Sequence, residues 1–157
     1  MSQLVMVIDD SPTVRRVMEV CLGRAGYEVA SFPEGVTALR WLQTPEVHLP
    51  GLVFLDIEMP GMDGYYVAQY LHARPQYRHI VIVLLSGYNG VLDRLKGRLA
   101  GAQQYLTKPC RTQVILAVVQ AYLGPLLVTG EEARDSMKQG TLAPGEWSSQ
   151  GKEQACD

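Results

Sequence analysis

The sequence has few cysteines and few charged residues, and it contains no long hydrophobic run. Its three cysteines, Cys21, Cys110 and Cys156, are odd in number and widely spaced, which argues against a disulfide-stabilised scaffold. A formal net charge of −2 gives no electrostatic reason to expect direct nucleic-acid binding. No apolar stretch approaches the length of a membrane span, and the N-terminus lacks a signal-peptide pattern. We therefore expect a cytoplasmic protein that does not insert into membranes.

The chain has the length and composition of one globular domain with an appendage. Hydrophobic residues make up 47% of its 157 residues, enough for a sizeable core. After Gly124-Pro125 and a short apolar stretch, the composition turns polar and loses any sustained period. We predict a folded domain over residues 1–124 and a mobile polar tail over residues 125–157, in which residues 131–138 could form a short helix. The sequence indicates neither a second domain nor an internal repeat.

Strand-like and helix-like patterns alternate five times along the predicted domain. Short apolar runs rich in branched residues are typical of buried strands, and longer segments with apolar residues at helical spacing follow each of them. The predicted strands are Leu4–Ile8, Tyr27–Ser31, Leu52–Leu55, Ile80–Leu85 and Ala102–Leu106, and the predicted helices cover residues 12–25, 33–43, 64–73, 89–99 and 110–123. This alternation predicts an α/β fold, with a parallel sheet covered by helices on both faces.

Polar residues follow four of the predicted strands, at the point where each apolar run ends. They are Asp9 and Asp10 after the first strand, Asp56 after the third, Ser86 after the fourth and Lys108 after the fifth. Doubly wound sheets bind ligands outside the carboxyl ends of their strands. We therefore expect these side chains to converge although they are far apart in the sequence.

The converging groups suit phosphoryl chemistry at a divalent cation. Three crowded carboxylates repel one another unless a cation lies among them, and Mg²⁺ (or Mn²⁺) accepts such ligands. We assign Asp10 and Asp56 as direct ligands and Asp9 as a ligand through water. Asp56 would also be the nucleophile that accepts a phosphoryl group. The metal, Lys108 and Ser86 would each bind one oxygen of that group.

Four motifs in this order resemble the receiver domain of bacterial two-component response regulators, over roughly residues 2–124. They are Asp9-Asp10, Asp56-Ile-Glu-Met-Pro-Gly-Met-Asp-Gly64, Ser86-Gly87 and Tyr105-Leu-Thr-Lys108-Pro109. The resemblance implies a flavodoxin-like, doubly wound (βα)5 sandwich whose five parallel strands lie in the order 2-1-3-4-5. Stand-alone, CheY-like regulators are the most similar in organisation, because we expect no output domain after the receiver.

The resemblance also implies the roles of the site residues. Asp56 is the phosphoacceptor, Ser86 the switch hydroxyl, Tyr105 the switch aromatic and Lys108 the phosphate-binding lysine. The main-chain carbonyl of Glu58 is the third protein ligand of the metal, and the Lys108-Pro109 peptide bond is cis.

The implied function is a phosphorylation-dependent signalling switch rather than an enzyme. A sensor histidine kinase donates phosphoryl to Asp56, the new charge draws Ser86 toward it, and Tyr105 turns inward. The face formed by the fourth helix, fifth strand and fifth helix then changes its affinity for a partner. The only intrinsic chemistry expected is phosphoryl acceptance and autodephosphorylation. The downstream target is not identified, although motility or pilus machinery fits the class, and the chain is expected to be a monomer or weak homodimer.

Two other functions remain open from the sequence. A phosphohydrolase with an aspartyl nucleophile usually needs a second acid two residues later, and Glu58 has that spacing. A degenerate receiver would only bind a partner. Against the hydrolase, we recognise no cap-domain or substrate-pocket sequence, and Lys108-Pro109 with Tyr105 fits a switch better. The complete set of site residues argues against the degenerate receiver.

Overall fold

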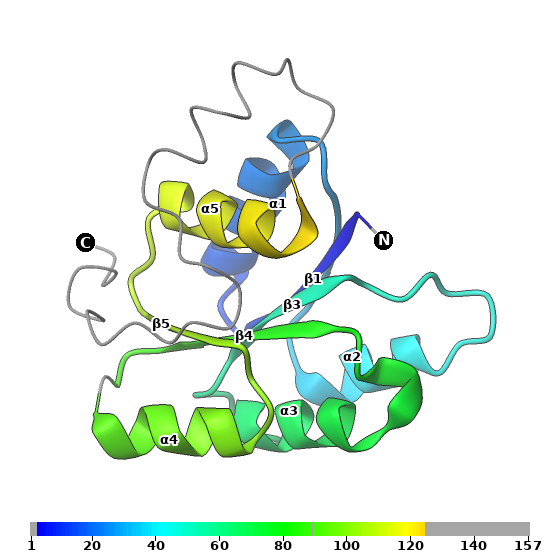
Figure 1. The fold of residues 1–157 in the computed structure, drawn as a ribbon. Coiled ribbons are helices and arrows are strands. Elements are labelled where there is room, and N and C mark those ends of the chain that lie inside the picture. The colour runs from blue at the N-terminus through cyan, green and yellow to red at the C-terminus, as the bar shows by residue number, and fades with distance from the viewer. Residues whose placement is uncertain (1–2, 89, 125–157) are drawn as a thin grey trace.

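A parallel β-sheet with helices on both faces forms the body of the protein (Figure 1). The computed structural model describes residues 3–88 and 90–124. The strands are β1 (Leu4–Ile8), β2 (Glu28–Phe32), β3 (Leu52–Asp56), β4 (Val81–Ser86) and β5 (Gln104–Thr107). The helices are α1 (Pro12–Arg24), α2 (Gly35–Leu42), α3 (Gly64–Ala73), the 3-10 turn η1 (Pro75–Tyr77), α4 (Val91–Leu99) and α5 (Thr112–Leu123).

The strand order is β2-β1-β3-β4-β5, and every pair is parallel. This confirms the predicted flavodoxin-like topology, including the strand order. The direction of strand succession reverses at β1, because β2 lies on one side of it and β3 on the other. In open α/β sheets the crevice at such a reversal is the usual ligand site. The topology therefore places a site at the carboxyl ends of β1 and β3.

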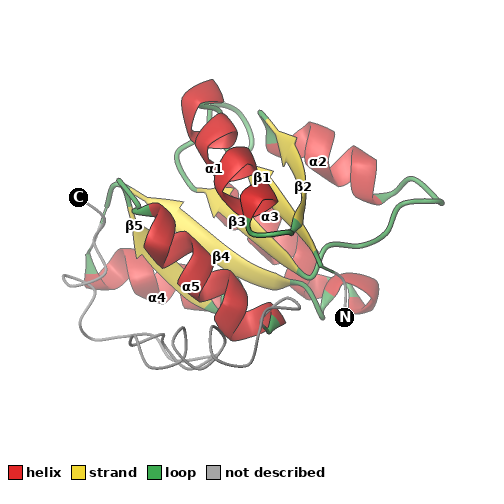
Figure 2. Ribbon diagram, turned by 90° about the horizontal axis from the view of Figure 1, so that it is seen from above, coloured by secondary structure: helices red, strands yellow, loops and turns green. Residues whose placement is uncertain are grey.

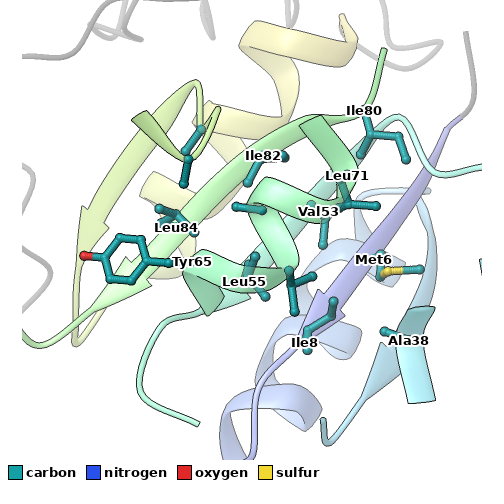
Figure 3. Close-up of a cluster of buried hydrophobic side chains, with 14 of the residues drawn as sticks. Met6, Ile8, Ala38, Val53, Leu55, Tyr65, Leu71, Ile80, Ile82 and Leu84 are labelled. Atoms are coloured by element: carbon teal, nitrogen blue, oxygen red, sulfur yellow. The ribbon is translucent and has the colours of Figure 1, made fainter. Parts of the chain in front are cut away.

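The helices form two layers, with α2, α3 and α4 on one face of the sheet and α1 and α5 on the other (Figures 1 and 2). Successive strand residues point to opposite faces, so each strand contributes to two cores. Met6, Val53, Leu55 and Leu84 belong to the core beneath α2 and α3 (Figure 3). Val5, Val7, Phe54, Val83 and Leu85 pack in the second core against α1 and α5. Because β1 and β3 are buried on both faces, they carry unbroken apolar runs that end at charged residues.

Capping side chains define the first turns of the two helices that follow the central strands β1 and β3. The Ser11 hydroxyl accepts a hydrogen bond from the Val14 N–H, and Pro12 occupies the first turn of α1. The Asp63 carboxylate accepts a hydrogen bond of 2.9 Å from the Tyr66 N–H at the start of α3. The Ser11 and Asp63 caps set where the loops after β1 and β3 end, and both loops lie at the carboxyl edge of the sheet.

Several element boundaries differ from the sequence prediction by one or two residues. Helix α4 begins at Val91 rather than Asn89, because the Gly90 N–H is held by the Asp93 carboxylate in a cap. Helix α5 begins at Thr112 rather than Cys110, after a cis Lys108-Pro109 peptide bond. The predicted tail, with its helix over residues 131–138, lies outside the described residues. Among the described residues, no helix is long and apolar enough to cross a membrane.

Candidate functional site

The predicted site residues meet at the carboxyl edge of the sheet. Asp9 follows β1, Asp56 and Ser86 are the last residues of β3 and β4, and Lys108 follows β5 directly. Asp9, Asp56 and Ser86 are buried, with at most 2% of each residue exposed. The convergence inferred from the strand ends is therefore present in the fold.

Three carboxylates form a compact acidic cluster. One oxygen from each of Asp9, Asp10 and Asp56 lies within 4.8 Å of the others. Asp9 and Asp56 are buried, whereas Asp10 is exposed at the rim of the site. Both oxygens of Asp9 already accept hydrogen bonds, from the Ser11 N–H at 2.9 Å and from the Lys108 ammonium at 2.8 Å. Asp10 and Asp56 consequently have more oxygen atoms available to an incoming cation.

Lys108 provides the counter-charge inside the cluster. Its Nζ atom lies 2.8 Å from Asp9 Oδ2 and 3.3 Å from Asp56 Oδ1. Burial alone would lower the pKa of Lys108, but hydrogen bonds and charge attraction from Asp9 and Asp56 raise it above its ordinary value. The lysine therefore stays charged and bridges the ends of β1 and β3.

The surroundings of Asp56 disfavour its charged form. Burial and repulsion from Asp9 raise its pKa from 3.8 to about 6, against the opposing effects of the Glu58 N–H and the Lys108 ammonium. The Glu58 N–H donates to Asp56 Oδ1 at 3.0 Å. Near neutral pH the Asp56 side chain is still mainly ionised, so its carboxylate oxygens can act as a nucleophile. Its negative charge is only partly balanced by the groups around it.

This donor set fits a divalent metal ion. Three carboxylates and one ammonium leave a formal charge of −2 in a largely buried space. Hard oxygen ligands of this kind, with an exposed rim that admits water, suit Mg²⁺ or Mn²⁺. The raised pKa of Asp56 is the electrostatic cost that such an ion would relieve.

Sequence reasoning did not find the partner of the Glu58 side chain. Its Oε1 atom accepts hydrogen bonds from the Ser86 hydroxyl and from the Gly87 N–H, both at 2.8 Å. The sequence indicated a main-chain metal ligand or a leaving-group acid at Glu58, but not this contact of its side chain. The signal was its two-residue spacing from Asp56, which places it in the loop that faces the end of β4.

Tyr105 lies buried on β5 with 5% of the residue exposed. Its hydroxyl donates to the main-chain carbonyl of Tyr88 at 2.7 Å. The Tyr88 N–H in turn donates to the Ser86 hydroxyl oxygen at 3.0 Å. The switch hydroxyl and the switch aromatic implied by the resemblance are thus joined through one residue of the β4–α4 loop.

Comparison with known proteins places this site in a family. The family model described as "Response regulator receiver domain" matches residues 5–120. The chain belongs to the response regulator receiver family. Protein PilG of Pseudomonas aeruginosa is 36% identical over 119 residues, covering 76% of this chain and 86% of PilG. The response regulator PleD of Caulobacter vibrioides is 37% identical over 131 residues, which is 83% of this chain but only 28% of PleD.

Solved structures agree with the receiver assignment. The chemotaxis protein CheY4 of Vibrio cholerae superposes with a TM-score of 0.71 at 26% identity, covering 78% of this chain and 99% of that one. A putative response regulator from Chloroflexus aurantiacus also gives a TM-score of 0.71, at 29% identity, covering 78% of this chain and 98% of that one. Receiver domains bind Mg²⁺ at an acidic pocket and interact with histidine kinases and downstream targets. In this receiver, Asp9, Asp10 and Asp56 form an acidic cluster that could hold such an ion.

The raised pKa of Asp56 predicts how the stability of this receiver depends on pH. A folded-state pKa of about 6, above the unfolded value, means that the folded state holds the proton more tightly between about pH 4 and pH 6. Without metal, Asp56 should therefore make the protein less stable as pH rises through this range. Asp56→Asn should remove this loss and make the protein more stable than wild type by about 2 kcal/mol at neutral pH.

Urea unfolding in metal-free buffer at several pH values checks this expectation. Glu46→Gln, which removes an exposed carboxylate from the α2–β3 loop, is the control and should change stability by less than about 0.5 kcal/mol. An Asp56→Asn variant with the same pH profile as wild type would contradict the assigned pKa shift.

Proposed function

We propose that this receiver is a phosphorylation-dependent switch that accepts a phosphoryl group on Asp56 from a sensor histidine kinase. One observation carries the proposal: the Asp56 carboxylate is 2% exposed, clustered with Asp9 and Asp10, and 3.3 Å from the Lys108 ammonium. A buried carboxylate with a raised pKa at a topological switch point is typical of a functional site rather than a structural ion pair.

A divalent ion would be held by Asp10, Asp56 and the main-chain carbonyl of Glu58, with Asp9 contributing through water. This division is supported by the two hydrogen bonds that already engage both oxygens of Asp9, and by the exposure of Asp10. When bound, Mg²⁺ or Mn²⁺ would neutralise charge on the acidic cluster and on the transferred group.

The residues of the chain define the transfer step. A carboxylate oxygen of Asp56 forms a bond to phosphorus while the bond from phosphorus to the histidine nitrogen of the donor breaks, and the nitrogen keeps that electron pair. Lys108 remains charged and can pair with one phosphoryl oxygen without losing its contact to Asp9. The Ser86 hydroxyl, at the neighbouring strand end, donates to another oxygen.

An apolar pocket beside the site offers a docking place for the donor. A pocket of about 410 Å³ lies between α1 and the start of α5 and extends to Lys108 and Pro109. Most of its lining is apolar and includes Val14, Met18 and Ile115. We propose that a helical surface of the kinase fills this pocket, which reaches Lys108, the residue whose ammonium lies 3.3 Å from Asp56 Oδ1.

The output surface is proposed to be the α4–β5–α5 face. Helix α4 carries four exposed aliphatic side chains: Val91, Leu92, Leu95 and Leu99 are 49–84% exposed. Apolar side chains gathered on one exposed helix are typical of an interaction surface. Hydrogen bonds connect Ser86 to Tyr88 in the loop before α4, and Tyr88 to Tyr105 on β5. A change in the position of Ser86 can therefore alter the α4–β5–α5 face.

The kind of target is suggested by a structural relative. CheY4 of Vibrio cholerae is named a chemotaxis protein, and 78% of this chain superposes on 99% of it. We propose that the target belongs to motility or pilus machinery and that signalling takes place in the cytoplasm. The receiver would act there as a monomer or a weak homodimer.

Labelling with a small phosphodonor tests the proposal. Acetyl phosphate with Mg²⁺ should add one phosphoryl group to the wild-type chain, measured by intact mass, and the label should be lost with time. Asp56→Asn should stay unlabelled, and a chelator should suppress labelling of the wild type. Equal labelling of both proteins would refute Asp56 as the acceptor.

The hydrolase alternative makes a different prediction. It requires the Glu58 carboxylate to protonate a leaving group, whereas that carboxylate accepts two hydrogen bonds from Ser86 and Gly87. Family membership also supports a signalling protein. Hydrolysis of a phosphate ester at many equivalents per chain would favour the hydrolase.

A further inference from the structure

The Glu58 side chain accepts hydrogen bonds from two donors at the end of β4, and one of them is the Ser86 hydroxyl that we propose binds the phosphoryl group. A single oxygen, Oε1, accepts from the Ser86 hydroxyl and from the Gly87 N–H at 2.8 Å each. Ser86 is only 1% exposed, so its hydroxyl has little access to water as an alternative partner. Glu58 itself is exposed, so its side chain can leave this position without opening the core.

Donor chemistry makes the two arrangements mutually exclusive. A serine hydroxyl has one proton, so Ser86 cannot donate fully to Glu58 and to a phosphoryl oxygen at the same time. The Gly87 N–H has the same limit. A carboxylate next to a doubly charged phosphoryl group is also repelled by it. Phosphorylation and the Glu58 contact therefore compete for the Ser86 hydroxyl, and displacement of the Glu58 carboxylate would also free the Gly87 N–H.

We propose that Glu58 is a positioning residue that holds Ser86 and Gly87 until a phosphoryl group on Asp56 displaces it. The inference rests on the proposed function, because the competitor is the phosphoryl group itself. The Glu58 contact lowers the net free energy that favours the phosphorylated arrangement, because two charge-assisted hydrogen bonds must break before the new ones form. Glu58 therefore shifts the equilibrium toward the unphosphorylated arrangement, so a larger phosphorylated fraction is needed for the same output.

The backbone explains why this residue can act on both sides of the site. The Glu58 N–H donates to Asp56 Oδ1, so the main chain is anchored to the acceptor, while the side chain reaches the end of β4. Ser86 Oγ also accepts from the Tyr88 N–H, and the Tyr88 carbonyl accepts from Tyr105. A change of partner at Ser86 is thereby passed toward the α4–β5–α5 face.

Titration with a phosphoryl mimic tests the proposal on the full chain. Beryllofluoride with Mg²⁺ is added to wild type, Glu58→Ala and Glu46→Gln, and binding is followed by the amide resonance of Gly87 in a nitrogen-15 correlation spectrum. Glu58→Ala should half-saturate at a concentration on the order of tenfold lower than wild type. Glu46→Gln removes an exposed carboxylate elsewhere and should match wild type.

Two further observations make the test specific. Before any beryllofluoride is added, the Gly87 amide resonance should shift in Glu58→Ala and not in Glu46→Gln, because only the first loses the acceptor. In a Ser86→Ala background, the gain from Glu58→Ala should shrink by at least about threefold, since the competition for the hydroxyl is gone. An unchanged Gly87 resonance, or half-saturation equal to wild type, would overturn the proposal. A wild-type protein that binds no beryllofluoride would instead refute the proposed function.

Discussion

Lys108→Met should lower the free energy of unfolding by about 3 kcal/mol at about pH 7.5 in metal-free buffer. The ammonium is the counter-charge for Asp9 and Asp56, at 2.8 Å and 3.3 Å. Both carboxylates are at most 2% exposed, so they cannot be compensated by water when the lysine is removed. Methionine keeps most of the side-chain volume, and the loss therefore reports the missing charge rather than a cavity.

The loss should depend on pH in a defined direction. Without Lys108 the pKa of Asp56, already raised to about 6, should rise further. A carboxyl group with a raised folded-state pKa costs stability as pH rises through that pKa, so the variant should be closer to wild type at about pH 5 than at about pH 7.5. Urea unfolding at both pH values measures this difference.

Lys96→Met is the matched control for Lys108→Met. Lys96 is exposed on α4, and its Nζ atom lies 4.4 Å from the centroid of the Tyr65 ring. Loss of this contact should cost less than about 1 kcal/mol and should not vary between the two pH values. Equal losses in Lys108→Met and Lys96→Met would show that the buried ion pairs contribute no more to the free energy of unfolding than an exposed contact does.

Gly64→Ala adds one methyl group near the site and should strongly lower the free energy of unfolding. A Cβ at this position would overlap the main-chain carbonyl oxygen of Asp56 and would lie only 2.8 Å from the Ile57 Cα. The obstacle is backbone at the end of β3 and cannot rotate away, so the start of α3 must shift. We expect a loss of at least about 2 kcal/mol in the free energy of unfolding, with weaker Mg²⁺ binding because Asp56 moves.

Gly23→Ala provides the comparison for Gly64→Ala. Gly23 lies near the end of α1, and a Cβ there would meet nothing within 4 Å. Alanine favours the helix, so this variant should gain about 0.5 kcal/mol. Thermal unfolding and Mg²⁺ titration of the two variants separate steric overlap from helix propensity. A Gly64→Ala protein as stable as wild type would refute the tight approach of α3 to β3.

Much of the fold was predictable because buried parallel strands leave a clear signal. The runs Leu4–Ile8 and Leu52–Leu55 are apolar at every position, since both faces of these strands are covered. The helices were predictable from apolar residues at helical spacing, and in the structure Ser11 and Asp63 cap the starts of α1 and α3. The strand order came from the resemblance, since alternation alone does not give the order.

The boundaries that were missed depend on contacts that a linear pattern does not encode. Helix α4 was predicted to start at Asn89, but the Gly90–Asp93 cap delays it to Val91. Strand β5 was predicted over Ala102–Leu106, whereas pairing with β4 places it at Gln104–Thr107.

The site was predictable in its members but not in its internal contacts. Four strand ends carried the required groups, so convergence followed from the topology alone. The contact of Glu58 with Ser86 was not predictable, because it depends on how the loop after β3 lies against the end of β4. The preference of Lys108 for Asp9 over Asp56 likewise follows from side-chain distances that no spacing rule gives.

Chemical trapping of the acyl phosphate tests the central claim most directly. Borohydride reduces an aspartyl phosphate to homoserine, so the modified residue can be located by sequencing peptides in a mass spectrometer. After treatment with acetyl phosphate and Mg²⁺, we predict homoserine at position 56 and nowhere else in the chain. Homoserine at Asp9 or Asp10, or none at any position in a protein that gained a phosphoryl group, would contradict the assignment of Asp56 as the acceptor.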